Sequence, residues 1–471
     1  MTQSSPLDDG VVEEFRAQFG GEILTAADEG YDIHRKVWNA MIDKHPGLIA
    51  RCHGVADVIT AVQFARDHAL LVAVRGGGHN VAGNAVCDGG LVIDLSPMKG
   101  IQVDSAARTV RTEAGATWSE FDRETQAFGL ATTGGLVSST GIAGLTLGGG
   151  IGWLTRKYGL ACDNLRSVDV VTAEGRLLTA SDTEHADLFW GVRGGEGNFG
   201  IVTTFEYDLH PLNMVMGGWI LYPVEQAREI LHFLSTDLST APDELTTVAR
   251  LFTLPVIELV PPPLQNQQVI GVGVCHCGAP KEAEALLRPL RHLSTVLIDL
   301  IAPMPYGVLQ TMIDGFSPPG LQHYWRSDYL RALDEQTIET ILSHVAQKTS
   351  PRSAIDLHQM GGEASRIAAS ATAFGHRDAP FLVNEIATWT DQEEAASHIA
   401  WARGLSAALQ PFSAGSYVNF LAQVRAQVTK AAYTEATYSR LVALKTTYDP
   451  TNLFRLNQNI PPREKGAAAG L

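Results

Sequence analysis

A strand-like run in this 471-residue chain leads directly into three glycines and a histidine, Arg75-Gly76-Gly77-Gly78-His79-Asn80. Successive glycines let neighbouring backbone N–H groups turn toward a single anion, which is how protein loops hold phosphate groups. Such a segment predicts a pyrophosphate cradle. A histidine and an asparagine at its end would stand next to whatever the cradle holds.

Two further glycine clusters follow, at 134–152 and 191–200. The cluster at 191–200 contains one literal match to G-x-G-x-x-G, from Gly195 to Gly200. This match leads into a strand and not a helix, so it is not a NAD fingerprint. A lysine-bearing phosphate loop of the G-x-x-x-x-G-K-S/T type is absent. Several glycine loops that converge on one long ligand favour a dinucleotide such as FAD. The alternative for any single cluster is a flexible surface turn.

The periodicity of apolar residues predicts the elements that position these loops. Asp57 is a natural N-cap for a helix that runs to about His68, and the strand 70–74 then enters the first glycine cluster. Further elements are expected in this half: a helix within 11–30, strands at 91–95, 109–112 and 201–207, a helix at 118–128, and a hairpin of 168–172 with 177–179.

The composition and the predicted elements change after about residue 210, where glycine becomes sparse and strands alternate with amphipathic helices. This predicts an α+β region whose elements are strands at 217–222 and 381–389, strands or turns at 361–362 and 372–374, a loop at 254–264, and helices at 224–234, 281–290, 334–349 and 392–409. A long helix is expected over 424–445, with Asp449-Pro450 stopping the chain beyond it.

Composition limits the function classes. The net charge of −16, with 35 basic residues spread along the chain, argues against nucleic acid or an anionic membrane as a partner. No signal peptide or membrane span is recognisable. Five scattered cysteines make no disulfide framework, and Cys275-His276-Cys277 has the wrong spacing for zinc, so no metal site is predicted. We expect a soluble, cytoplasmic protein; no oligomeric state is predicted.

Six motifs together resemble one family, the berberine-bridge-enzyme-like FAD-linked oxidases of the vanillyl-alcohol-oxidase and p-cresol-methylhydroxylase superfamily. They occur in the family's order at 74–80, 141–153, 157–164, 193–200, 416–420 and 448–459. The resemblance implies an α+β fold. A two-part FAD domain would be built from 1–208 and 422–471, with a substrate domain containing an antiparallel sheet at 209–421.

The resemblance also implies that FAD is bound covalently at two positions, with His79 joined to the flavin 8α-methyl and Cys162 to C6. An uncharged imidazole and a thiolate are suitable nucleophiles for an electron-poor ring. The remaining residues expected to contact FAD are Arg75, Gly76, Gly77, Gly78, Asn80, Ser139, Thr140, Gly141, Gly144, Gly149, Gly150, Gly152, Trp153, Asn164, Gly200, Ile201, Val202, Tyr417, Asn457 and Asn459.

The family motif Ser416-Tyr-Val-Asn419 makes Tyr417 the candidate base that deprotonates a substrate hydroxyl. A phenol needs cationic or hydrogen-bonding neighbours to lower its pKa from about 10. Many relatives carry an acidic residue shortly after this motif, whereas Leu421-Ala-Gln follows here. Asn384 and Glu385 are further candidates, of which at most one can face the site because adjacent strand residues point to opposite faces. His376 is the last candidate.

We therefore expect an oxidase that removes a hydride from the alcohol carbon of a sugar, an oligosaccharide or a natural product and passes electrons to molecular oxygen, giving hydrogen peroxide. Related C–H or C–N bonds are also possible targets. A dehydrogenase with another acceptor, a tailoring monooxygenase and a non-catalytic flavin carrier are the alternatives. Four aromatics of the middle region are candidates for pocket or core: Tyr306, Tyr324, Trp325 and Tyr329.

Overall fold

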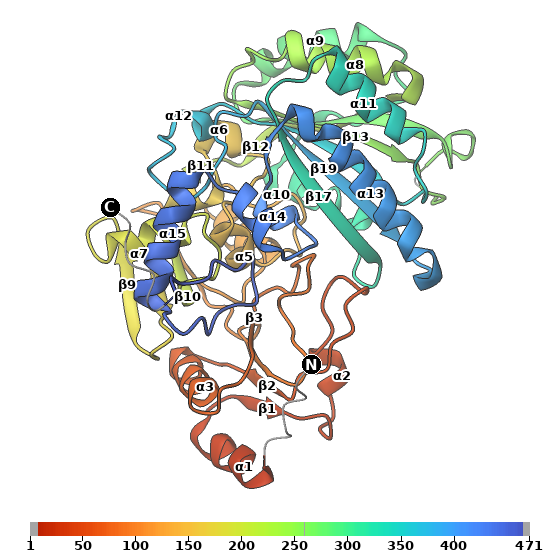
Figure 1. Cartoon of the computed structure of the whole chain (residues 1–471). Coiled ribbons are helices and arrows are strands. Elements are labelled where there is room, and N and C mark those ends of the chain that lie inside the picture. Colours follow the sequence, from red (N-terminus) through yellow and green to blue (C-terminus); the bar gives the residue numbers. More distant parts are fainter. Residues whose placement is uncertain (1–7, 259, 465–471) are drawn as a thin grey trace.

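The computed structural model describes residues 8–258 and 260–464. A small α/β layer forms the lower end of the molecule in Figure 1. Its four strands have the order β1-β2-β4-β3, with β2, β4 and β3 parallel and β1 antiparallel. The elements are α1 (Asp9–Gln18), β1 (Glu22–Leu24), α2 (Tyr31–His34), β2 (Leu48–Arg51), α3 (Val55–Asp67), β3 (Val72–Arg75) and β4 (Leu91–Asp94).

The expected N-cap of α3 is wrong by one turn. The helix begins at Val55 with Gly54 at the N-cap, and Asp57 lies in its first turn. The Asp57 carboxylate accepts hydrogen bonds from the N–H groups of Gly20 and His53, each at 2.8 Å. An acidic side chain therefore still sits at the helix N-terminus, where it is stabilised by the helix dipole, but it also fastens two loops.

A five-stranded antiparallel sheet of order β5-β6-β10-β8-β9 forms the second layer. The expected hairpin is confirmed as β8 paired with β9. The strands of this sheet are β5 (Ile101–Asp104), β6 (Thr109–Glu113), β8 (Leu165–Val171), β9 (Leu177–Ser181) and β10 (Ile201–Asp208). The other elements of this part of the chain are α4 (Trp118–Gln126), β7 (Leu130–Ala131), α5 (Ile142–Leu147), α6 (Thr155–Tyr158), α7 (Ala186–Val192) and β11 (His210–Pro211).

A large antiparallel sheet forms the upper part, with the order β15-β12-β14-β13-β18-β19-β17-β20 and β16 paired to β12 among the described residues. Its strands are β12 (Met214–Pro223), β13 (Leu245–Thr253), β14 (Gln268–His276), β15 (Ile298–Asp299), β16 (Ala302–Pro305), β17 (Gln322–Leu330), β18 (Ala354–Gln359), β19 (Phe381–Trp389) and β20 (Ser413–Gly415). Cys275 lies in buried strand β14, as expected. Segment 372–374, expected to be a strand or turn, belongs to no strand.

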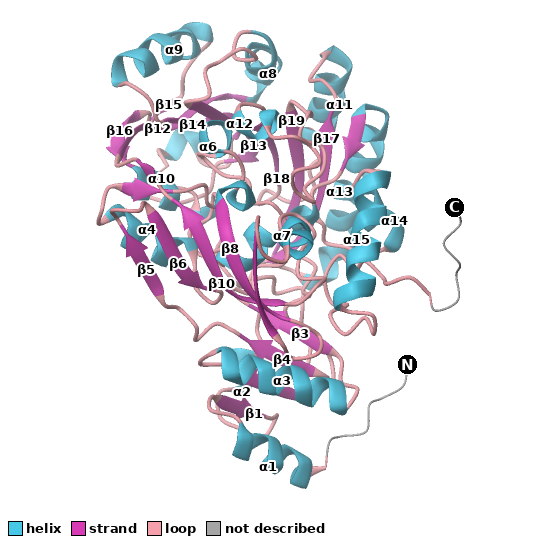
Figure 2. Ribbon diagram, turned by 90° about the vertical axis from the view of Figure 1, so that its left-hand side faces the viewer, coloured by secondary structure: helices cyan, strands magenta, loops and turns pink. Residues whose placement is uncertain are grey.

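The four longer helices of this part lie along the outer face of the sheet (Figure 2). They are α8 (Ala227–Thr236), α9 (Pro280–Leu293), α11 (Glu335–Val345) and α13 (Ala395–Leu409). Their buried faces pack on apolar side chains of the sheet such as Ile220, Ile270 and Val383. The inner face is turned toward the first two layers, with the short helices α10 (Tyr306–Thr311) and α12 (Glu363–Arg366) at its margins. Side chains on that inner face are thus available to a site between layers.

The C-terminal segment returns to the first half of the chain. One core cluster joins Phe189, Phe199 and Phe205 with Leu441 and Phe454. The expected long helix is wrong, because two helices occur, α14 (Ala426–Ala431) and α15 (Glu435–Tyr448). Thr434 is the N-cap that starts the second, since its hydroxyl accepts a hydrogen bond from the N–H of Thr437 at 3.2 Å. With helices and largely antiparallel sheets in one chain, the fold is α+β.

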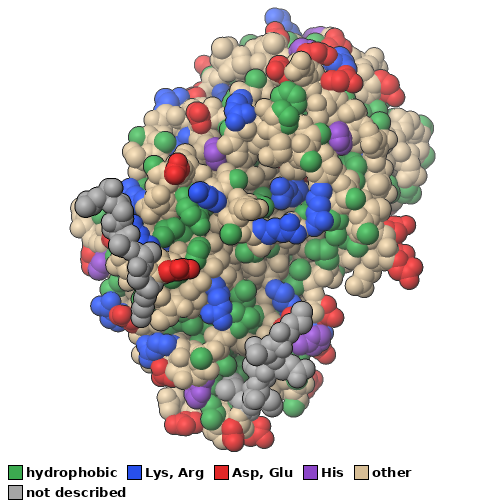
Figure 3. Space-filling view, viewed as in Figure 1, with side chains coloured by type: hydrophobic (Ala, Val, Ile, Leu, Met, Phe, Trp, Pro, Cys, Tyr) green, Lys and Arg blue, Asp and Glu red, His purple; other side chains and the backbone are tan. Residues whose placement is uncertain are grey.

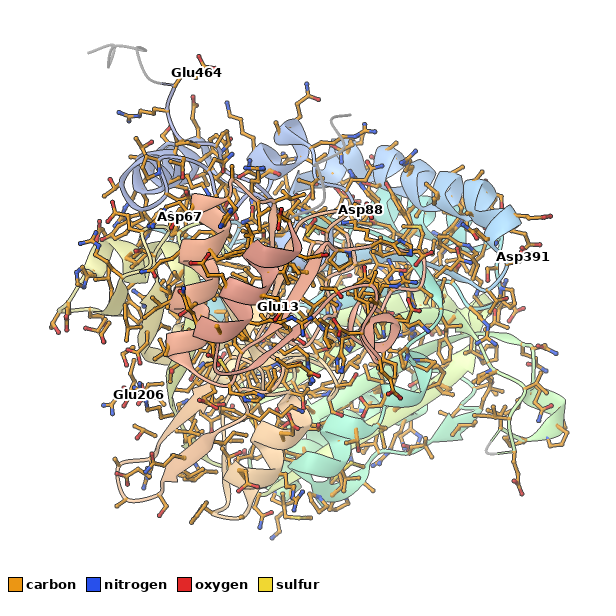
Figure 4. All side chains as sticks on the ribbon, turned by 90° about the horizontal axis from the view of Figure 1, so that it is seen from below. Glu13, Asp67, Asp88, Glu206, Asp391 and Glu464 are labelled. Atoms are coloured by element: carbon orange, nitrogen blue, oxygen red, sulfur yellow. The ribbon has the colours of Figure 1, made fainter. Side chains whose placement is uncertain are left out.

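The acidic excess is dispersed. Among the acidic side chains labelled in Figure 4, Glu206, Asp391 and Glu464 lie at separate margins of the view. The face in Figure 3 carries acidic groups at both ends and basic groups nearer the middle. In the described part of the chain, no helix has both the length and the apolar character needed to cross a bilayer.

Candidate active site

One continuous cavity lies where the glycine loops meet the inner face of the large sheet. Backbone from all three glycine clusters lines one part of it, and side chains from β13, β17, β18 and β19 line the other. The expected residues that line this cavity are Gly76, Gly77, Gly78, His79, Asn80, Thr140, Gly141, Gly144, Gly200, Ile201, Val202, Asn384, Tyr417 and Asn457.

The first two glycine clusters touch backbone to backbone. A Cβ on Gly77 would lie 2.5 Å from the nitrogen of Gly141, and a Cβ on Gly141 would lie 2.5 Å from the nitrogen of Gly77. Gly78 has φ +69°, a conformation that glycine adopts without strain. The glycines therefore serve two purposes, since they let the two loops approach each other and they present N–H groups at the cavity wall.

Gly77→Ala should lower the free energy of unfolding by about 1–3 kcal/mol, because the added methyl group overpacks a backbone contact. Less FAD should co-purify with this variant. Thermal unfolding and the ratio of flavin to protein absorbance measure the two effects. Gly404→Ala in α13 is the matched control, since the added Cβ would meet no described atom within 4 Å other than its chain neighbours and the helix's own backbone. Equal unfolding temperatures for the two variants would contradict the close approach.

His79 stands where the cradle meets the substrate side. Its imidazole stacks on Trp38 with ring centroids 5.0 Å apart, and Trp38 stacks on His323 of β17 at 3.9 Å. The Nε2 atom of His79 is 3.0 Å from the hydroxyl oxygen of Ser139. Burial lowers the pKa of His79 to about 4, so the ring is uncharged at neutral pH and keeps a nucleophilic lone pair.

Cys162 is placed differently. Its side chain is fully buried in the core of the first half, and it is absent from the described residues that line the cavity. Its Sγ is 3.8 Å from Oδ1 of Asp163, and burial raises the pKa of the thiol well above its usual value. His79 therefore lines the cavity wall and Cys162 does not, and the expected second attachment point stays a prediction.

Several other residues that were expected to contact FAD make contacts within the protein. The Arg75 guanidinium donates to the carbonyl of His34. Asn164 donates to the carbonyls of Tyr158 and Leu160, and the ring of Trp153 is buried against Trp219. Gly149, Gly150, Gly152, Ser139 and Asn459 also lie outside the cavity lining, although Gly150 and Ser139 hydrogen-bond lining residues.

Tyr417 lines the cavity, and its phenol oxygen accepts two hydrogen bonds. The N–H of Gly150 donates at 3.0 Å and Nδ2 of Asn419 donates at 2.8 Å. These hydrogen-bonding neighbours were expected, but burial outweighs them and raises the pKa of Tyr417 above 10. The two lone pairs of the phenol oxygen are thus occupied by these donors, and the O–H group of Tyr417 points away from both of them.

Of the other catalytic candidates, only Asn384 faces the cavity. Glu385 is fully buried on the opposite face of β19, beside Asp328 and Arg326, and burial raises its pKa well above the usual value. His376 has φ +57°, and its Nε2 is 3.4 Å from the carbonyl of Ala431. Neither Glu385 nor His376 is among the residues that line the cavity.

The structure adds residues that the sequence interpretation missed. Arg250, Asp356 and His358 line the substrate side, and Glu196 lines the cradle side. Glu196 accepts a hydrogen bond from the N–H of Gln458 at 2.6 Å, and burial raises its pKa to about 7. Polar residues that alternate with apolar ones in the strand 354–359 were a signal from which Asp356 and His358 could have been predicted.

Of the four aromatic residues of the middle region, Trp325 lines the cavity, while Tyr306, Tyr324 and Tyr329 are buried in the core.

A mixed-sheet domain with a glycine cradle, closed by an antiparallel sheet, defines a flavoprotein-type dinucleotide site. Comparison with known proteins agrees. Residues 46–181 match the model of an FAD binding domain, and residues 416–461 match the berberine and berberine-like model.

An FAD-linked oxidoreductase of Dictyostelium discoideum is 32% identical over 457 residues, covering 96% of this chain and 97% of that protein. (R)-6-hydroxynicotine oxidase of Paenarthrobacter nicotinovorans is 32% identical over 461 residues, covering 94% and 97%. The solved structure of 6-hydroxy-D-nicotine oxidase from Arthrobacter nicotinovorans has a TM-score of 0.86 at 31% identity, covering 94% of this chain and 98% of that one. A chitooligosaccharide oxidase shares the fold, with a TM-score of 0.85 at 22% identity and coverage of 96% and 100%.

The chain belongs to the berberine-bridge-enzyme-like family of FAD-linked oxidoreductases. It is an enzyme, and its cofactor is FAD.

Proposed function

We propose that this enzyme is an oxidase that removes a hydride from a carbon bearing a hydroxyl group in a small molecule, with molecular oxygen as the final acceptor. The observation that carries the proposal is the single cavity, in which a glycine cradle and a polar, aromatic sheet face are continuous. A site with a flavin at one end and a binding face at the other allows direct transfer between substrate and cofactor.

The residues fit FAD. The cradle glycines leave space that side chains would fill, since a Cβ on Gly144 or Gly197 would meet no atom within 4 Å. Asn457 lines the cavity, and its Oδ1 is buried without a hydrogen-bond partner among the described residues. Buried polar atoms are normally paired, so a ligand group is expected there. When bound, FAD supplies an electron-poor ring that accepts a hydride and is reoxidised by oxygen.

We infer that FAD is attached through His79 alone. The uncharged imidazole at the cavity wall is a competent nucleophile, whereas a buried, protonated Cys162 thiol is not. A single tether at the junction of the two halves still fixes the cofactor while leaving the substrate side open. Ser139 holds the imidazole through its hydrogen bond to Nε2.

Tyr417 is the residue that we propose moves the substrate proton. Its oxygen is held by the N–H of Gly150 and the amide of Asn419, so a phenolate formed there would accept two hydrogen bonds. Because its pKa is raised by burial, the phenol is protonated at neutral pH until the environment changes. Alcohol oxidation should therefore become faster with rising pH.

The raised pKa of Tyr417 also favours a second candidate function, oxidation of a C–N bond. A neutral amine carries a lone pair on nitrogen and can lose a hydride from the neighbouring carbon without a base, so a tyrosine with a raised pKa is no obstacle. The relative named (R)-6-hydroxynicotine oxidase makes amines a reasonable class to test.

A substrate screen by peroxide release, on protein whose visible spectrum confirms bound flavin, tests the proposal. It should include sugars, oligosaccharides, aromatic alcohols and cyclic amines. Peroxide equal to product supports an oxidase. Flavin reduction with turnover only on artificial acceptors would show a dehydrogenase. Label from isotopic oxygen gas in the product would show a monooxygenase.

Tyr417→Phe should retain its flavin but lower kcat/KM for an alcohol by about 10²–10⁴, the usual contribution of a positioned acid or base. The rise of the rate with pH should disappear. Tyr329→Phe is the control, since this buried hydroxyl has no hydrogen-bond partner in the described part of the chain and lies outside the cavity lining. For an amine substrate the loss should be less than about tenfold. An unchanged pH profile with alcohols would remove Tyr417 from the proposed role.

A further inference from the structure

A row of polar side chains crosses four neighbouring strands of the large sheet. Arg250 of β13 pairs in register with Asp356 of β18, Asp356 with Asn384 of β19, and Asn384 with Ser327 of β17. Residues opposite one another on adjacent strands share a face, so the row lies on the inner side of the sheet. Its first three members line the cavity.

One end of the row is tied to the reacting end of the cavity. The hydroxyl of Ser327 donates to the carbonyl of Tyr417 at 3.2 Å and accepts from the N–H of Tyr417 at 3.0 Å. Arg250 lies three strand spacings away, about 14 Å at roughly 4.8 Å per spacing. The two ends of the row are thus separated by about the length of a molecule with two rings.

The far end of the row is a charged pair with spare hydrogen-bonding atoms. The Arg250 Nη1 atom lies 3.2 Å from Oδ2 of Asp356, and each side chain is 11% exposed. Within residues 8–258 and 260–464, Nε of Arg250, Oδ1 of Asp356 and Oδ1 of Asn384 have no hydrogen-bond partner. Leaving a buried polar atom unpaired is unfavourable, so these atoms are prepared for a ligand.

The chemistry of that ligand follows from what the pair presents. A donor and an acceptor stand side by side, and the two charges cancel. The neighbouring His358 is uncharged at neutral pH because burial lowers its pKa to about 4. An ionic group placed here would leave one member of the pair with a like charge beside it. Aromatic walls complete the pocket, with Phe316 5.7 Å from the Arg250 guanidinium and Trp325 edge-on to Phe420 at 5.8 Å.

We propose that Arg250 and Asp356 bind the end of the substrate remote from Tyr417, and that this end is an uncharged group with an acceptor next to a donor. A vicinal diol of a sugar ring and the lactam of a heteroaromatic ring both have this chemistry. Arg250 donates to the acceptor oxygen, and Asp356 accepts from the adjacent O–H or N–H. The inference rests on the proposed function, because it assigns one end of the same cavity.

Binding of simple probes tests this subsite separately from turnover. The flavin-containing enzyme is titrated with two matched pairs, 2-pyridone against N-methyl-2-pyridone and trans-1,2-cyclohexanediol against cyclohexanol, and Kd is read from the perturbed flavin spectrum. In at least one pair the member that keeps both groups should bind about tenfold or more tightly, as expected for one buried hydrogen bond to a charged group. The pair that discriminates identifies the lactam or the diol as the source.

Asp356→Asn should reduce that preference to less than about twofold, a loss of the same hydrogen bond. The double variant Arg250→Gln with Asp356→Asn, which leaves no unpaired charge, is measured as well in case the single variant folds poorly. No discrimination by the unaltered enzyme, or discrimination that survives in both variants, overturns the subsite. If the probes discriminate as expected but the enzyme oxidises no substrate, the proposed function fails while the subsite stands.

Discussion

Acid-denatured protein should carry its yellow colour into the precipitate, and the His79→Ala variant should release all of its flavin into the supernatant. His79 is the nucleophile that lines the cavity beside the cradle, with an imidazole kept neutral by burial. Removing it removes the only attachment that we propose. The flavin spectrum of pellet and supernatant, measured after precipitation, gives the result directly.

The Cys162→Ala variant is compared with His79→Ala in the same acid-precipitation experiment. Its precipitate should stay coloured, because the thiol lies in the core and not among the described cavity residues. Colour that persists in the His79→Ala pellet and disappears only when both residues are changed would establish the two-bond attachment that the family resemblance suggested. That result would overturn the proposed attachment through His79 alone.

Breaking the ion pair between Lys445 and Asp449 should have the largest effect on stability. Both side chains are fully buried, with Nζ and Oδ2 2.7 Å apart. Lys445 also donates to the carbonyls of Asn198 and Phe454, and Asp449 accepts from the N–H groups of Leu453 and Phe454. The pair therefore holds the C-terminal tail against the third glycine cluster.

Lys445→Met should lower the free energy of unfolding by about 3–5 kcal/mol, because it leaves a carboxylate buried without its partner. FAD content should fall too, since Phe454 and Asn457 of the tail line the cavity. Chemical unfolding and flavin ratios provide the measurements. Lys99→Met breaks the exposed pair with Glu120 and should cost less than about 1 kcal/mol. Similar losses in the two variants would contradict a fastening role for the buried pair.

Local patterns predicted most of the elements. The strand before Gly76 and the hairpin of β8 and β9 were recognisable because their signals lie within a few residues. The long helix was wrong because the Thr434 cap restarts the chain within an otherwise helical pattern, and a hydroxyl at one position decides that break. The N-cap expected at Asp57 was wrong, and the long-range hydrogen bond that its carboxylate accepts from the N–H of Gly20 depends on the fold.

The site was predictable only where its residues are contiguous. The cradle and His79 form one segment, so their chemistry can be seen in the sequence. Arg250 and Asp356 are 106 residues apart and meet through the register of β13 with β18, which no local pattern specifies. Cys162 was predicted from a motif alone, and its buried position in the core could not be read from that motif.

Peptide mapping of the enzyme tests the central claim, that FAD occupies this cavity and is joined to His79. Tryptic cleavage separates residues 76–99, which contain His79, from residues 158–166, which contain Cys162. Mass spectrometry with fragmentation should find one flavin, on the first peptide and on the histidine itself. A flavin on Cys162, or two unmodified peptides from fully yellow protein, would contradict the account.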